Sequence, residues 1–140
     1  MSKCLQFALV SLLSVLFANS SYAEGDVKLD GKWVIISVER DGKADDTLKG
    51  AVREHKGEKY TMTLKEGKSF EGSMKVDATA KSIDLIPGDG KYKGKTLLGI
   101  YELDGDTLKI CFAEPGKERP KTFVSKADSG IVLAVHKKEK

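Results

Sequence analysis

The residues KYTMTLKEGKSFEGSMKVD, numbers 59 to 77, decide the fold of this chain. Apolar side chains alternate with polar ones on both sides of the short turn Glu66-Gly67. A period of two is typical of a β-strand with one face buried and the other in water. The two runs therefore predict an antiparallel hairpin. Its inward positions are Tyr60, Met62, Leu64, Phe70, Gly72, Met74 and Val76.

The same pattern extends along the rest of the chain. A second hairpin is predicted from Leu97–Leu103 and Leu108–Ala113, joined by Asp104-Gly105-Asp106. No helix longer than a turn or two is indicated. Many short antiparallel strands form a sandwich or a closed barrel, and a barrel leaves no exposed sheet edge. We therefore predict an all-β fold, a small antiparallel up-and-down β-barrel of about eight strands. The remaining strand-like segments are 32–40, 50–56, 81–86, 121–125 and 131–136.

The N-terminal segment has the pattern of an export signal. Lys3 supplies a positive charge, Leu5–Phe17 is mostly apolar, and Ser21-Tyr22-Ala23 places small residues before a cleavage site. We expect residues 1–23 to be a signal peptide, residues 24–140 to be one domain, and the protein to be periplasmic or secreted. The alternative, an uncleaved anchor over residues 4–18, would be short for a membrane span.

Composition narrows the range of partners. The 140 residues include 24 Lys and Arg against 21 Asp and Glu, a balance too even to indicate a nucleic-acid or membrane-surface binder. Cys4 lies in the predicted signal, so Cys111 is left alone and an intramolecular disulfide is not expected. We expect a monomer that is not inserted in the membrane after cleavage.

A longer motif begins at Gly31-Lys32-Trp33, which matches the G-x-W opening of lipocalins. Together with the segments given below, the chain resembles an uncharacterised, exported, lipocalin-like (calycin-type) domain family expanded in planctomycete bacteria. The resemblance covers nearly all of residues 29–136. It implies a calycin-type barrel and no known activity. In lipocalins a basic side chain near the end of the last strand usually packs across the tryptophan, and the candidates here are Lys137 and Lys138. The segments that carry the resemblance are 29–35, 39–43, 83–85, 94–112 and 115–120.

No pattern of catalytic or metal-ligating residues emerges. Pro87–Thr96 looks like a phosphate loop, but Asp89 stands where the motif needs glycine, and a strand follows instead of a helix. His55 and His136 lack ligands at metal-binding spacing, and Cys111 has no activating base nearby in sequence. We expect a protein that is not an enzyme and that carries no cofactor or metal.

The predicted barrel suggests two functions. Barrels of eight strands are wide enough either to hold one small molecule or to be filled by side chains, and the sequence leaves both open. In the first case we expect a non-catalytic binder of a small apolar or amphipathic molecule. In the second, a filled barrel would use its loops 41–49, 87–95 and 114–120 as a protein-interaction module, for example as a protease inhibitor with a partner in the cell envelope. The candidate ligand-binding residues are Trp33, Tyr60, Met62, Phe70, Met74 and Phe112.

Overall fold

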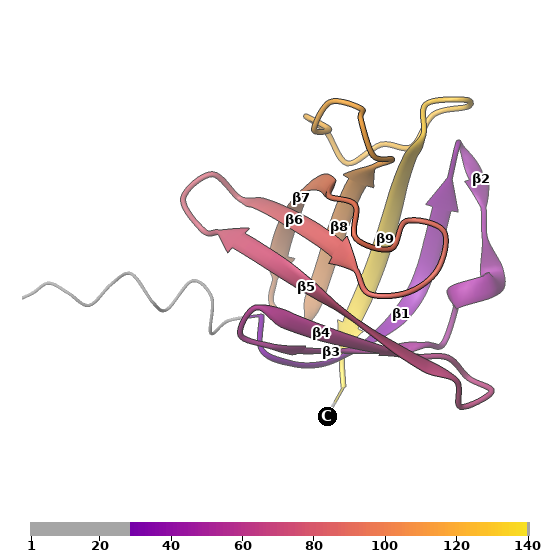
Figure 1. Ribbon diagram of the computed structural model, residues 1–140, viewed down its shortest axis with the longest axis vertical. Coiled ribbons are helices and arrows are strands. Elements are labelled where there is room, and N and C mark those ends of the chain that lie inside the picture. Colours follow the sequence, from indigo (N-terminus) through magenta and orange to yellow (C-terminus); the bar gives the residue numbers. More distant parts are fainter. Residues whose placement is uncertain (1–28, 140) are drawn as a thin grey trace, which may run out of the picture.

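Each long strand of the computed structural model, which describes residues 29–139, is hydrogen-bonded to a neighbour on both sides (Figure 1). The strands β3 to β9 pair in sequence as an antiparallel meander, and β1 pairs with both β3 and β9, so that eight strands close into a barrel. The short β2 forms a hairpin with the end of β1 outside the closed ring. The all-β, up-and-down barrel predicted from the sequence is therefore confirmed. The strands are β1 (Gly31–Arg40), β2 (Lys43–Ala44), β3 (Val52–Lys56), β4 (Lys59–Thr63), β5 (Ser69–Asp77), β6 (Ser82–Pro87), β7 (Leu97–Asp104), β8 (Thr107–Ala113) and β9 (Ile131–Lys138), with one 3-10 turn, η1 (Asp46–Leu48).

The hairpin of β4 and β5, predicted from residues 59–77, has the expected register. Tyr60 of β4 lies opposite Gly72 of β5, and Met62 lies opposite Phe70. Gly72 is needed here, because a Cβ built on it would lie 2.5 Å from the Tyr60 ring. The tyrosine therefore lies flat against β5 and fills the space that a side chain would take.

The predicted strand at residues 121–125 is wrong, because this segment has no ladder pairing. It follows Pro120, which has no N–H to donate, and its Val124 side chain is 47% exposed. Ser125 holds the segment in place through side-chain hydrogen bonds: its Oγ accepts from the Gly42 N–H (2.9 Å) and donates to the Ile131 carbonyl (2.8 Å). The long loop between β8 and β9 lies at the end of the barrel at which β8 ends and β9 begins (Figure 1).

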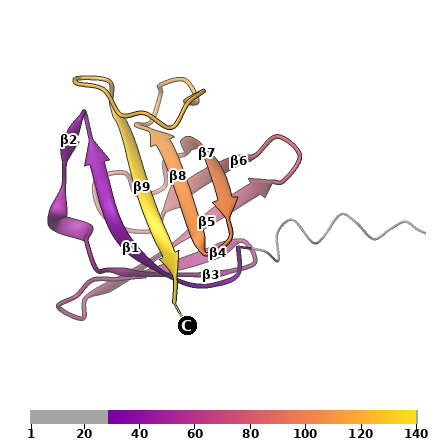
Figure 2. The ribbon, with the colours of Figure 1, turned by 180° about the vertical axis from the view of Figure 1, so that it is seen from behind.

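A β-bulge interrupts the pairing of β1 with β9. Pairing with β9 shifts between Ile35 and Ser37, and this extra residue leaves Ile36 pointing outward and 44% exposed. Before the bulge β1 pairs with β3, and beyond it β1 pairs with β2. Figure 2 shows the resulting wall of β1, β9, β8 and β7 from behind.

Trp33 closes the opposite end of the barrel from the long loops. Its indole Nε1 donates to the Leu29 carbonyl (3.0 Å), and Lys138 places its ammonium 4.7 Å from the ring centroid. The same ammonium donates to the Asp30 carbonyl (2.8 Å). Gly31, at a φ of 121°, leaves room for it, because a Cβ there would lie 2.5 Å from the Lys138 Nζ. Of the two candidates, Lys138 is therefore the basic residue across the tryptophan.

Residues 1–28 lie outside the described part of the chain, so the signal peptide at 1–23 and the domain start at residue 24 stay predictions. Within residues 29–139, no helix has the length and apolar character of a membrane span.

Candidate functional site

A cavity of about 550 Å³ occupies the half of the barrel that faces the long loops. This volume lies within the range of roughly 300–1,000 Å³ found for small-molecule sites. The three loops expected at the rim do meet at its mouth, each contributing lining residues. The wall residues are Arg53, Tyr60, Met62, Phe70, Leu85, Leu97 and Phe112, and the mouth residues are Arg40, Asp41, Leu48, Pro87, Asp89, Lys91, Tyr92 and Glu114.

Four of the six predicted ligand-binding residues, Tyr60, Met62, Phe70 and Phe112, line this cavity. Trp33 and Met74 do not line it. Each is 1% exposed and packs in the apolar cluster that fills the other half of the barrel. The barrel is thus filled toward Trp33 and hollow toward the loops, which combines the two alternatives that the sequence left open.

The inner wall of the cavity carries a buried cation that was not among the predicted ligand-binding residues. Arg53 of β3 points inward and is only 5% exposed. Its Nε donates to His55 Nε2 (2.8 Å), and its guanidinium carbon lies 4.0 Å from the centroid of the Tyr60 ring. Burial lowers the pKa of Arg53 to about 10, which still leaves it charged at neutral pH.

Two histidines lie in the barrel interior beside this arginine. Burial, together with the nearby charge of Arg53, lowers the pKa of His55 to about 2 and that of His136 to about 3. Both rings are therefore neutral at physiological pH. His136 Nδ1 lies 3.1 Å from the Leu108 carbonyl, so this nitrogen carries the proton and donates.

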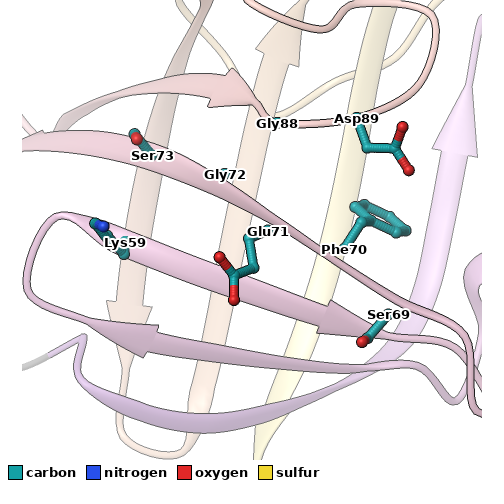
Figure 3. Close-up of a pocket in the computed structure, with 8 residues that line it drawn as sticks. All are labelled: Lys59, Ser69, Phe70, Glu71, Gly72, Ser73, Gly88 and Asp89. Carbon is teal, nitrogen blue, oxygen red and sulfur yellow. The ribbon is translucent and has the colours of Figure 1, made fainter.

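A second hollow, of about 480 Å³, lies on the outside of β5 where it separates from β6 (Figure 3). Figure 3 shows Phe70 and Glu71 leaving β5 in different directions. Phe70 and Asp89 line both this hollow and the inner cavity, so the two spaces adjoin at these residues. The other lining residues are mostly exposed and polar, and nothing in their arrangement indicates a ligand.

The other potentially reactive side chains are buried or hydrogen-bonded within the fold. Cys111 is fully buried, its Sγ lies 3.5 Å from the Thr122 carbonyl, and burial raises the pKa of its thiol. Tyr92 of the loop 87–95 donates to Glu114 Oε2 (2.8 Å) at the cavity mouth. In the part of the chain that the structure describes, no three His, Cys, Asp or Glu side chains are placed to hold a metal ion.

No protein-family model, curated protein or solved structure matches the chain. The resemblance to the exported lipocalin-like family therefore stays a prediction.

Proposed function

We propose that this chain is an exported, lipocalin-like, non-catalytic protein that binds a small apolar or amphipathic molecule inside its barrel. The observation that carries the proposal is the cavity, whose wall is formed largely by the apolar side chains Met62, Phe70, Leu85, Leu97 and Phe112. A closed barrel that serves only as a scaffold gains stability from filling such a space, because unfilled apolar volume forfeits packing energy. Export to the periplasm or beyond rests on the pattern of residues 1–23.

Native mass spectrometry tests the proposal. The full chain would be produced in an exporting bacterium, purified gently and compared with Leu97→Trp, which places a larger side chain in the cavity wall. A reproducible extra mass of a small molecule on the parent chain, reduced in the variant, supports a ligand. A bare chain mass for both, repeated after incubation with envelope lipids, contradicts it.

One observation favours a second candidate, the protein-interaction module. The loops that contribute Asp41, Lys91 and Glu114 gather at one end of the barrel, where a partner could contact all of them together. Capture of a stoichiometric envelope protein that is lost in Lys91→Glu, but retained in Leu97→Trp, would favour this function over the cavity. No partner at micromolar concentrations of bait would count against it.

A further inference from the structure

Arg53 is a buried cation that pairs with no acidic side chain in the part of the chain that the structure describes. Its side chain lies on the inner wall of the cavity, and none of the ion pairs within residues 29–139 includes it. Its Nη2 is buried and has no hydrogen-bond partner among residues 29–139. Buried charges are normally paired, because an isolated one loses its hydration without replacement.

The arginine is held in one orientation. His55 accepts from its Nε, the Tyr60 ring packs against its guanidinium, and Gly72 leaves the space in which that ring lies. The guanidinium is therefore positioned before any ligand arrives, so little conformational freedom remains to be lost on binding.

The charged side chains of the cavity place one cation on its inner wall and all the others at its mouth. Arg53 is the one charged side chain among the wall residues, so a cation would be repelled there, whereas Arg40 and Lys91 lie at the mouth with the acidic side chains. The histidines beside Arg53, His55 and His136, are neutral and add no charge. The acidic side chains of the cavity are at its mouth. Two of them already have partners, since Asp41 accepts from the Gly130 N–H (2.7 Å) and Glu114 accepts from Tyr92.

We propose that Arg53 binds the carboxylate of a monoanionic amphiphile whose apolar body lies against Met62, Phe70, Leu85, Leu97 and Phe112. This inference rests on the proposed function and specifies its ligand class. A planar guanidinium matches a carboxylate geometrically, and a single positive charge on an otherwise apolar wall balances one negative charge. A dianionic group such as a phosphate monoester would leave charge uncompensated in the barrel.

Decanoate and 1-decanol test this proposal, since they share an apolar chain and differ in the acidic group. Both would be titrated into the purified full chain and into two variants by calorimetry at pH 7.5. Arg53→Met and Lys91→Met each remove one positive charge from the residues around the cavity, the first from the wall and the second from the mouth. Circular dichroism would verify that each variant folds.

We expect the parent chain to bind decanoate at least tenfold more tightly than 1-decanol, because a charge-assisted hydrogen bond forms in a site shielded from water. Arg53→Met should abolish this preference while still binding 1-decanol, and Lys91→Met should keep it. Equal binding of the two probes by the parent chain overturns the proposal and leaves the proposed function intact. A preference that survives in Arg53→Met also overturns it.

Two further outcomes are informative. Binding of neither probe by the parent chain contradicts the proposed function itself, and the inference with it. If Arg53→Met fails to fold, Arg53→Gln replaces it. The comparison of decanoate with 1-decanol on the parent chain also tests the preference for an anion without any variant.

Discussion

Mild acid should destabilise this barrel, because it buries two neutral histidines. In the folded chain the pKa of His55 is about 2 and that of His136 about 3, against an ordinary value of 6.5 that the unfolded chain retains. Between these values the unfolded state binds protons that the folded state does not. The free energy of unfolding therefore falls as the pH drops below about 6.5, and the loss levels off only near the folded pKa values.

The size of this loss in unfolding free energy follows from the difference between the solution pH and the pKa of histidine in the unfolded chain. At pH 5.0 the solution is about 1.5 pH units below the unfolded pKa, and each unit contributes about 1.4 kcal/mol per histidine. Each histidine thus costs about 2 kcal/mol, and the pair about 4 kcal/mol, relative to pH 7.5. The result depends little on the folded values, because any folded pKa below about 4 leaves both rings neutral at pH 5.0. This is a large part of a typical domain stability of roughly 5–15 kcal/mol.

Urea unfolding at pH 7.5 and pH 5.0 measures the effect, with the fluorescence of Trp33, the only tryptophan of the chain, as the signal. His136→Gln and His55→Gln serve as matched controls, and each should halve the pH dependence. Hydrogen bonds from Thr47 hold the pKa of Asp45 below its ordinary value, so this carboxyl stays charged at both pH values. A loss under about 1 kcal/mol, or a His136→Gln variant with an undiminished loss, would refute the reasoning.

Three other predictions concern packing. Gly72→Ala should lower the free energy of unfolding by about 1–3 kcal/mol in urea titrations, because the new Cβ would lie 2.5 Å from the Tyr60 ring. An unchanged free energy of unfolding would mean that the ring has room to move. Lys138→Ala should cost about 1 kcal/mol and shift Trp33 emission to longer wavelength, since it removes a cation–π contact and uncovers the indole; unchanged emission would contradict this. Cys111 should resist a thiol reagent in the folded protein and react fully in urea, because it is buried and burial raises its pKa; rapid labelling without urea would show an accessible thiol.

The barrel was predictable from the sequence because the patterns that specify it lie within short, contiguous segments. Alternation in residues 59–77 and 97–113 specifies which face of each strand is buried, and short turns specify which strands pair. The segment 121–125 has the composition of a strand, yet both neighbouring positions in the ring are taken, since β8 pairs directly with β9. Composition alone cannot exclude a strand whose partners are already occupied.

Arg53 was missed although the sequence contains a signal for it. In Val52–Lys56 the apolar Val52 suggests that its own face is buried, which would place Arg53 outside. The turn at Gly57-Glu58 decides otherwise, because it aligns Arg53 with Met62 and His55 with Tyr60. Residues opposite each other in an antiparallel pair share a face, so inward Tyr60 and Met62 require an inward arginine and histidine. Register, and not the hydrophobicity of the strand, was the informative feature.

The energetic cost of burying Arg53 bears on the proposed ligand class. The pKa of Arg53 is about 10 against an ordinary 12.5, so burying its charged form costs the fold about 3 kcal/mol at neutral pH. An apolar side chain of similar size would avoid that cost, and such replacements of buried charges are often neutral or stabilising. A bound anion would offset it instead, and it would raise the apparent stability in proportion to the logarithm of its concentration. The proposed ligand class therefore predicts that the folded protein is less stable when the cavity is empty and more stable when an anion is bound.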